Sequence, residues 1–371
     1  MINSNLDITS IELDSVFDAH VHLRQTGQLA ELVTPHLAQG GISTAYVMPN
    51  TIPPITTTKM ALAYRAELQA LSPNTEFLMS LYLSPQLDVE EVQRAKSAGI
   101  VGVKSYPRGV TTNSSGGVES YEIYYPVFEM MEKLGMILNL HGEVPSNPHD
   151  GTCVLNAEAR FLPKLLQLHQ RFPKLRIVLE HATTRNAIEA VKSCGPTVGC
   201  TITAHHLTLT VDDWAGNGLN FCKPVAKFPD DREALREVIR EGHPQFFLGS
   251  DSAPHPITSK LPNHPSTCCA AGIYTSPYLL PSLASIFESA LPPPTSSSEI
   301  RQILSPIPLN RLNGFVSTFG RAFYGIEKNE KGHTLARDDE KIVELKITGE
   351  RDHEVVVPFW AGRKLGWKLN T

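Results

Sequence analysis

Short hydrophobic runs rich in Val, Ile and Leu recur along the chain, and they alternate with stretches in which apolar residues follow the helical period. Eight of these runs have the length and the β-branched content of buried strands. They cover residues 16–22, 41–50, 76–83, 100–107, 136–143, 176–183, 197–207 and 245–255. Strands that alternate with helices in this way predict βα units around a parallel sheet.

The segments between the runs predict amphipathic helices, and several of them end in Gly, as helix C-termini often do. These helices are expected over residues 58–71, 87–99, 125–135, 162–172, 185–195 and 230–242. Eight strands with intervening helices in about 250 residues match the size of a TIM barrel. The predicted fold class is therefore α/β, a (β/α)8 TIM barrel with a small C-terminal extension.

The 371 residues are expected to form a single domain, because no internal repeat and no second domain stand out. The barrel core is placed at about residues 15–330 and the extension at about 335–371. KIVELKI (341–347) and EVVVPFW (354–360) predict a hairpin in that extension. LPPPTSSSE (291–299) has the composition of a loop or linker.

Charge, apolar segments and cysteine spacing exclude several classes of function. The net charge is −5 and the basic residues are scattered, so no nucleic-acid partner is expected. No apolar segment opens the chain and no stretch approaches the length of a membrane span, which predicts a soluble, cytoplasmic protein without a membrane partner. The six cysteines are irregularly spaced and form no CxxC pair, which favours a reducing compartment.

Polar residues end most of the predicted strands, and in TIM barrels these ends carry the chemistry. His20 and His22 are two residues apart on the first strand, so both imidazoles face the same side. His141, His181 and Asp251 end the fifth, sixth and eighth strands. So many buried polar groups need a common partner, and four imidazoles with one carboxylate predict a metal centre.

Lys104 also lies near a strand end, where its ammonium group would repel metal ions. A desolvated lysine beside cations has a lowered pKa, and its neutral amine can add carbon dioxide to become a carbamate. Such a carbamate would act as a carboxylate bridge between two metal ions about 3.5–4 Å apart.

This combination of HxH, Lys, His, His and Asp resembles the binuclear amidohydrolase superfamily, and the finer motifs resemble its monofunctional dihydroorotase branch. The resemblance spans about residues 15–285 in unbroken order. The motifs are FDAHVHLR (17–24), MPN (48–50), GVKSYPRGVTTNSSGG (102–117), NLHGE (139–143), LEHATT (179–184), ITAHHL (202–207), FCKPVAK (221–227) and LGSDSAPH (248–255).

The resemblance implies zinc-dependent, reversible hydrolysis of (S)-dihydroorotate to N-carbamoyl-L-aspartate, the third step of de novo pyrimidine biosynthesis. It also implies about two Zn²⁺ ions per subunit, bridged by N6-carboxylysine at Lys104. One ion would be held by His20, His22, Lys104 and Asp251, and the other by Lys104, His141 and His181. Asp251 would also be the general base and then the proton donor to the leaving nitrogen.

The same resemblance assigns the substrate contacts. Arg24, Asn50 and His255 would hold the substrate carboxylate, and backbone groups near Lys223, Ala271 and Gly272 would pair with the ring amides. Thr111 and Thr112 would close over the substrate on a mobile lid. His141 counts among the substrate contacts as well as the metal ligands. A homodimer is expected on resemblance alone.

Two alternatives stay open. A hydantoinase or dihydropyrimidinase would share the metal centre but take rings that lack the carboxylate, against which Arg24 and Asn50 speak. A catalytically inactive scaffold would be expected to have lost ligands, whereas this set is complete. His205 and His206 have the side chains of metal ligands too, but they extend past a strand end and are assigned to neither metal ion.

Overall fold

An eight-stranded parallel sheet forms the centre of the computed structural model, which describes residues 8–25, 27–263, 268–288, 304–328, 331–349 and 355–370. The strands follow one another in chain order around the sheet. They are β2 (Phe17–Val21), β3 (Thr44–Val47), β4 (Glu76–Tyr82), β5 (Gly102–Ser105), β6 (Ile137–His141), β7 (Arg176–Glu180), β8 (Val198–Ile202) and β9 (Phe246–Leu248). Each lies within one of the eight predicted runs.

The sheet closes on itself where the residues after β9 meet β2. The backbone N–H of Asp251 donates to the carbonyl of His20 at 2.9 Å, and that of His22 donates to the carbonyl of Ser252 at 3.0 Å. A parallel bridge also joins Val21 to Ser252. The result is a nearly closed barrel, which confirms the predicted TIM-barrel class.

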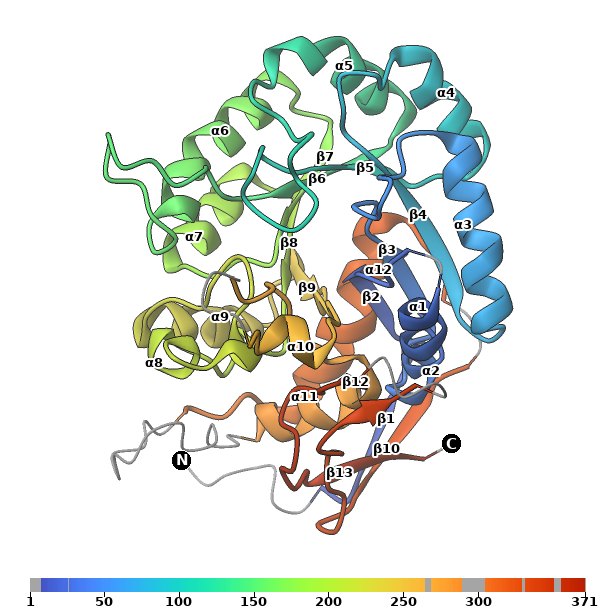
Figure 1. Ribbon diagram of the computed structural model, residues 1–371, viewed down its shortest axis with the longest axis vertical. Helices are drawn as coiled ribbons and strands as arrows, with labels where there is room; N and C mark the ends of the chain where they lie inside the picture. The colour runs from blue at the N-terminus through green and yellow to red at the C-terminus, as the bar shows by residue number, and fades with distance from the viewer. Residues whose placement is uncertain are drawn as a thin grey trace.

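Helices surround the barrel and connect its strands (Figure 1). The six that the sequence predicts are present, with ends that differ by a few residues. The helices between strands are α1 (Gln28–Val33), α2 (His36–Gln39), α3 (Thr58–Leu71), α4 (Val89–Ser97), α5 (Tyr125–Leu134), α6 (Ala157–Arg171), α7 (Arg185–Cys194), α8 (Val211–Trp214) and α9 (Pro229–Glu241). After β9 follow α10 (Ile257–Lys260), α11 (Leu279–Phe287) and α12 (Phe319–Tyr324).

Local sequence explains where several helices start and stop. The side chains of Thr57, Asp88 and Thr184 each accept a hydrogen bond from a backbone N–H in the first turn of α3, α4 and α7. Such N-caps satisfy donors that the helix itself leaves free. Gly135 and Gly242 take the left-handed conformation after α5 and α9, which glycine adopts at little cost.

A polar network crosses the barrel floor. Tyr324 of α12 packs edge-on against Phe17 and Tyr46, with ring centroids 5.0 and 5.3 Å apart. The Asn139 amide donates to the Tyr324 hydroxyl at 2.8 Å and to Glu180 at 2.6 Å, and its oxygen accepts from Tyr46 at 2.9 Å. Helix α12 thus closes one end of the barrel and supports the buried Glu180 carboxylate from below.

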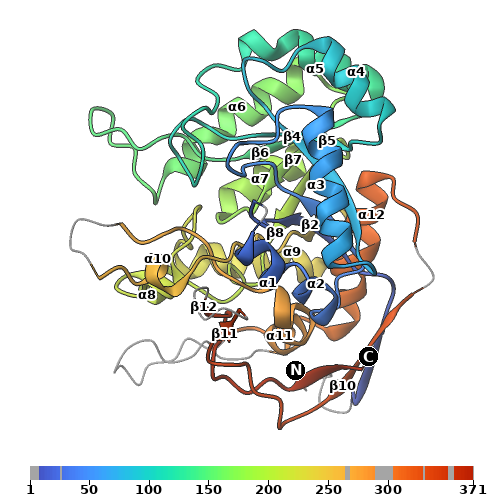
Figure 2. The same ribbon diagram turned by 45° about the vertical axis from the view of Figure 1, so that its right-hand side comes forward.

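Both ends of the chain join in a small sheet beside the barrel (Figure 2). Strand β10 (His333–Arg337) pairs antiparallel with β1 (Ser10–Leu13) and with β13 (Trp367–Asn370). The sequence did not predict this sheet. Each strand is short, and β1 finds its partner more than 300 residues away, so no local pattern marks it.

The late hairpin is much shorter than the sequence predicts. Among the described residues of this region, β11 (Ile347–Thr348) and β12 (Val355–Val356) pair in a two-residue antiparallel ladder. Before β11, Ile342 forms one isolated bridge to Lys364 instead of a strand. The predicted linker at 291–299 lies outside the described residues. Within the described ranges, no helix has the length and apolar character to cross a membrane.

Candidate metal and substrate site

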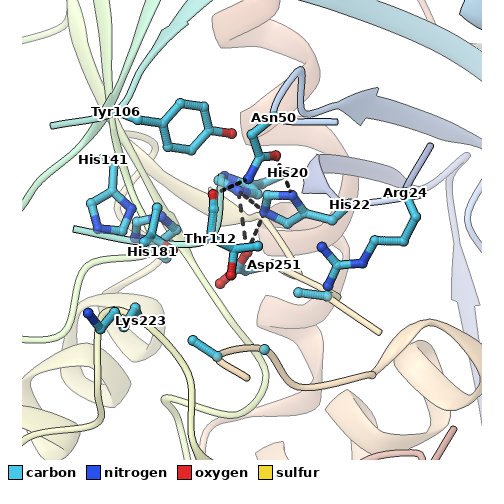
Figure 3. A pocket seen from close by; sticks show the side chains of 14 residues that line it. His20, His22, Arg24, Asn50, Tyr106, Thr112, His141, His181, Lys223 and Asp251 are labelled. Carbon is cyan, nitrogen blue, oxygen red and sulfur yellow. Dashed lines mark hydrogen bonds and ion pairs between the residues drawn. The ribbon is translucent and has the colours of Figure 1, made fainter. Parts of the chain in front are cut away.

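A pocket opens at the carboxyl ends of the barrel strands, and most of the predicted site residues line it (Figure 3). Lys104 and His255 are not among its lining residues, and their positions are given below. The lining residues are His20, His22, Arg24, Asn50, Tyr106, Thr111, Thr112, His141, His181, Lys223, Asp251, Ala253, Ala271 and Gly272.

His20, His22 and Asp251 form the tightest group of possible metal ligands. The Nε2 atoms of the two imidazoles lie 3.3 Å apart. Both face one carboxylate oxygen of Asp251, His20 at 3.4 Å and His22 at 3.0 Å. Three donor atoms at such spacing, all from buried or nearly buried side chains, could coordinate one ion. The strand alternation that placed both histidines on one side therefore gives the expected geometry.

Acceptors behind the imidazoles fix which ring nitrogen faces the pocket. The Nδ1 of His20 donates to Glu180 at 2.8 Å, and the Nδ1 of His22 donates to the Asn50 side-chain oxygen at 2.9 Å. Metal-binding histidines commonly donate their other N–H in this manner, which sets the tautomer and the ring orientation. Both Nε2 atoms are thereby left with a lone pair toward Asp251.

His141 and His181 lie on the other side of the group. Their ring centroids are 4.7 Å apart, and the His181 ring is 5.0 Å from that of His20. The Nε2 of His141 contacts Glu143 at 2.9 Å, so its Nδ1 is the nitrogen free for a ligand role. The Nδ1 of His181 is buried and has no hydrogen-bond partner among the described residues. Burial lowers the pKa of both imidazoles, which keeps them neutral.

Lys104 is completely buried near the end of β5. Its Nζ has no hydrogen-bond partner among the described residues and lies 5.3 Å from the ring centroid of Tyr106. Burial lowers the lysine pKa to about 8, although the charges of Glu180 and Asp251 act in the opposite direction. An orphaned, buried amine is costly unless it binds something, so the position fits a modified or bridging group.

Asp251 occupies a strained backbone position held by a second carboxylate. Its φ is 45°, and His181 has φ 42°, which non-glycine residues rarely adopt. Asp18 accepts from the backbone N–H and hydroxyl of Ser250 at 2.8 and 2.6 Å, and so fixes the turn. Burial would raise the pKa of Asp251, but its interactions with His22, His20 and His205 hold it well below its usual range. Asp251 is thus ionised and aimed at the imidazoles.

The Arg24 guanidinium group supplies positive charge on the side of the pocket away from His141 and His181 (Figure 3). Its Nε donates to the carbonyl of Pro254 at 2.6 Å, whereas one terminal nitrogen is buried without a partner among the described residues. Burial lowers the arginine pKa only to about 10, so the group stays charged at neutral pH. An anionic substrate group would satisfy the free donor.

The resemblance implies that Asn50 and His255 bind the substrate carboxylate, but both side chains already have partners within the protein. Besides accepting from His22, the Asn50 amide donates to the carbonyl of Thr112 at 3.1 Å, which leaves it one free N–H. His255 lines an adjoining cavity that Arg24 also borders, and its Nε2 donates to the carbonyl of Ala271 at 2.9 Å. Burial lowers the His255 pKa to about 3. The neutral ring offers only a lone pair on Nδ1, so contact with a carboxylate requires protonation.

The predicted lid contributes Thr111 and Thr112 to the pocket lining and is hydrogen-bonded to neighbouring segments on two sides. Lys223 donates through Nζ to the carbonyl of Val110 at 2.7 Å. On the other side, the Asn113 amide donates to the backbone carbonyl of Asn50 at 2.8 Å. Backbone groups near Lys223 were expected to pair with the ring amides, and the structure adds a side-chain contact from Lys223 to the lid.

Ala271 and Gly272 lie in a backbone segment that a buried ammonium group organises. The Nζ of Lys260 donates to the carbonyls of Phe221, Ala270 and Gly272 at 2.7, 2.9 and 2.7 Å. All three N–H bonds of the ammonium group are therefore used. The backbone N–H of Gly272 also donates to the Phe221 carbonyl at 3.0 Å. These bonds fix the segment that was expected to pair with ring amides.

Sequence reasoning missed the residues that orient the candidate ligands. Glu180 directly precedes His181, Glu143 follows His141 by two positions, and Asp18 precedes His20 by two positions. These acidic neighbours were visible in the sequence as E-H, H-x-E and D-x-H pairs. Tyr106, whose buried hydroxyl has no partner among the described residues, was also missed, because nothing local separates it from a core tyrosine.

Comparisons with known proteins agree with this site. Residues 17–184 match the family model described as Amidohydrolase, a class that the histidine, lysine and aspartate donors at the strand ends also define. The chain is 49% identical to a dihydroorotase of Mycosarcoma maydis over 98% of this chain and 99% of that protein. It is 43% identical to the dihydroorotase of Saccharomyces cerevisiae, with 98% of each chain covered. The chain belongs to the dihydroorotase family.

Solved structures give the same result. A crystal structure of Saccharomyces cerevisiae dihydroorotase in complex with 5-fluoroorotic acid aligns with a TM-score of 0.89 and 42% identity. That alignment covers 98% of this chain and 99% of the other. An L-hydantoinase (dihydropyrimidinase) from Arthrobacter aurescens aligns with a TM-score of 0.78 at 18% identity, which shows a shared fold alone.

Family membership implies a binuclear metal site, and the residues present fit one. The fit rests on three observations: the close triad of His20, His22 and Asp251, the orphaned Nδ1 of His181, and the orphaned amine of Lys104. Six donor side chains exceed what one tetrahedral ion requires. The neutral imidazoles of His22, His141 and His181 and the ionised carboxylate of Asp251 are also in the protonation states that metal binding needs.

Proposed function

We propose that this protein catalyses the reversible hydrolysis of (S)-dihydroorotate to N-carbamoyl-L-aspartate. The observation that carries the proposal is the buried guanidinium group of Arg24, with a free donor, beside a buried cluster of metal-ligand residues. Dihydroorotate combines a cyclic amide with a ring carboxylate, so it would engage both features. The relatives named dihydroorotase, aligned over nearly the whole chain, support the same substrate.

The metal in this proposal is zinc, with His20, His22 and Asp251 on one ion and His141 and His181 on the other. Lys104, as its carbamate, would complete both coordination spheres. When bound, the pair of ions supplies Lewis acidity at the scissile carbonyl and lowers the pKa of the attacking water. The support for Lys104 is its burial, its lowered pKa and its lack of a hydrogen-bond partner.

Asp251 is the proton carrier in this mechanism. Its carboxylate is ionised, so it can accept the proton of the attacking water. The same oxygen can then deliver that proton to the amide nitrogen as the ring opens. The strained φ of 45° and the Asp18–Ser250 contacts hold the carboxylate where both transfers are possible.

Arg24 sets the specificity by binding the substrate carboxylate. A charge-assisted pair between guanidinium and carboxylate is stronger than a neutral hydrogen bond and fixes the orientation of the ring. The remaining N–H of Asn50 adds a further donor, and the negative charge of the bound carboxylate would favour the protonated form of His255, which could then donate as well. Thr111 and Thr112 on the lid exclude water from the closed pocket, while backbone groups of the segment containing Ala271 and Gly272 hold the ring amides.

A hydantoinase or dihydropyrimidinase function is the second candidate, because such enzymes share the barrel. Their rings lack the carboxylate and would leave the Arg24 donor unpaired in a buried pocket. That loss weighs against them. The inactive-scaffold alternative requires a defective donor set, and the described residues contain every donor that the metal centre needs.

The proposal also places the reaction in the third step of pyrimidine biosynthesis, in the cytoplasm. A homodimer remains an expectation from the family.

Product analysis tests the proposed function. Purified holoenzyme is incubated with dihydroorotate, and the ring-opened ureido acid is identified by NMR and by its colour reaction. Ring closure of N-carbamoyl-aspartate is followed in the reverse direction with the same sample. We expect both conversions, each abolished by a chelator and restored by Zn²⁺. Zinc-loaded, folded protein that converts neither compound would refute the proposal.

A further inference from the structure

A second group of possible metal ligands lies outside the site described above. It comprises His205, His206 and Cys222, all buried, whose ligand atoms lie within 4.8 Å of one another. The two histidines come from the loop after β8. Cys222 comes from a later segment, 16 residues beyond His206, so the cluster lies where two loops meet. None of its members belongs to the family's binuclear set.

His206 and Cys222 converge on one point. The Cys222 Sγ lies 3.7 Å from the Nε2 of His206, and both atoms contact the carbonyl of Pro224, at 3.2 and 3.1 Å. Ligand atoms around a tetrahedral zinc ion, with bonds of about 2.0–2.3 Å, are separated by roughly these distances. Without an ion, the N–H of His206 and the S–H of Cys222 both donate to the Pro224 carbonyl.

The other side of the His206 ring is oriented as in a metal-binding histidine. Its Nδ1 lies 2.9 Å from the hydroxyl of Thr203, which also accepts the backbone N–H of His206 at 3.0 Å. A hydroxyl can accept from Nδ1–H or donate to a bare Nδ1, so it serves both tautomers. Coordination through Nε2 would therefore need only a tautomer change and no movement of the ring.

His205 supplies the independent indication that something binds here. It is completely buried, yet neither of its ring nitrogens has a hydrogen-bond partner among the described residues. Its ring centroid lies 4.4 Å from that of His206. A buried imidazole whose nitrogens have no partner destabilises the fold, and a bound ion would remove part of that cost.

We propose that His205, His206 and Cys222 form a third metal site for Zn²⁺ or a similarly thiophilic ion, separate from the binuclear centre. Two imidazoles and a thiol select such ions over Mg²⁺ or Ca²⁺. Binding displaces the thiol proton of Cys222 to solvent, so one S–H bond is exchanged for one S–metal bond. The inference goes beyond the proposed function and does not depend on it.

Charged groups of both signs surround the cluster, and the thiolate formed on binding makes the site more favourable for a cation. Asp251 and Glu143 act on the cluster as negative charges, whereas Lys227 and Lys260 oppose a cation. The thiolate formed on binding adds a further negative charge at the ligand itself. An ion in this position would tie the loop after β8 to the segment that carries Lys223, which lines the substrate pocket.

Cobalt substitution tests the proposal with a signal that the binuclear centre cannot give. The holoenzyme is reconstituted with Co²⁺, and its near-ultraviolet spectrum is examined for sulfur-to-cobalt charge transfer. All donors assigned to the binuclear centre are nitrogen or oxygen, so the band reports the third site alone. We expect it in the wild type and in Lys104→Ala, but not in Cys222→Ser. Cys269→Ser, which removes a thiol outside the cluster, is the matched control and should keep the band.

Two further measurements test the third metal site. Elemental analysis of zinc-loaded protein should find one more ion per chain in the wild type than in Cys222→Ser. His205→Gln, which breaks no hydrogen bond given by the structure, should raise the Co²⁺ dissociation constant at this site more than about tenfold. A wild type without the band, or a Cys222→Ser variant that is folded by circular dichroism and keeps the band, overturns the proposal. Wild-type protein that shows the band but does not turn over dihydroorotate would instead refute the proposed function.

Discussion

Replacing Arg24 with Met tests the origin of substrate specificity. The substitution removes the guanidinium charge while keeping a long apolar side chain in the same space. In the structure, Arg24 contributes one donor to the Pro254 carbonyl at 2.6 Å and presents another, unpartnered, to the pocket. The variant would leave the substrate carboxylate without its main partner in a closed, desolvated pocket.

The size of the effect follows from that geometry. Removing one partner of a buried ion pair costs about 3–5 kcal/mol, because the remaining charge is left uncompensated. Since 1.36 kcal/mol corresponds to a factor of ten, kcat/KM for dihydroorotate should fall by about 10²–10⁴-fold. Arg24→Lys keeps the charge but loses the planar guanidinium group. Its kcat/KM should therefore lie between the values of Arg24→Met and the wild type.

The assay is steady-state hydrolysis of dihydroorotate with metal analysis of the same preparations. Metal content should stay at the wild-type value, because Arg24 is not a ligand in this account. Arg108→Met is the matched control, since Arg108 is half-exposed and pairs with Glu119 on the surface. It should change kcat/KM little, as exposed ion pairs contribute about 0–1 kcal/mol. A kcat/KM for Arg24→Met within about threefold of the wild type would refute the role of Arg24.

Three further variants probe other parts of the structure. Lys104→Ala should lose most activity and recover part of it with a small added carboxylic acid, which replaces the bridging carbamate; full activity without additive would exclude Lys104 as a ligand. Lys223→Met removes the bond to Val110, so it should speed proteolysis within the lid and raise KM more than it lowers kcat, with Lys223→Arg close to the wild type; unchanged proteolysis would show that this contact does not hold the lid. For Glu158→Gln the readout is unfolding free energy against pH. Burial raises the Glu158 pKa from 4.5 to about 7, so the folded state keeps a proton that the unfolded state releases. The stability that this adds is fully present below pH 4.5 and is lost as pH rises through about 7, by ~3 kcal/mol at 1.36 kcal/mol per pKa unit. The variant should lack that slope, and equal slopes in urea titrations from pH 5 to 8 would contradict the assignment.

The barrel and the places of the candidate metal-ligand side chains were predictable because both depend on local patterns. Hydrophobic runs, helical periodicity and terminal glycines gave all eight strands and the helix after most of them. His20 and His22 could be placed together because strand geometry alone puts alternate residues on one side. Polar residues at the strand ends identified the rest of the set, since the barrel brings those ends to one rim.

The remaining features depend on contacts between distant segments. Strand β1 pairs with β10, which lies more than 300 residues later, and neither carries a distinctive pattern. Strand alternation alone would point Glu180 and His181 to opposite sides, but the positive φ of His181 breaks that alternation and lets both residues serve the site. The contact between Cys222 and His206 depends on the conformation of a loop, which their separation in the sequence does not predict.

The central claim is that this chain is a metal-dependent cyclic amidase that selects dihydroorotate by its carboxylate. The most direct test compares kcat/KM of the purified holoenzyme for dihydroorotate and for dihydrouracil, under the same conditions and with measured metal content. A site built around a buried arginine should prefer dihydroorotate by several orders of magnitude, because the other ring leaves that charge unpaired. Equal kcat/KM values for the two rings, or a preference for dihydrouracil, would contradict the account.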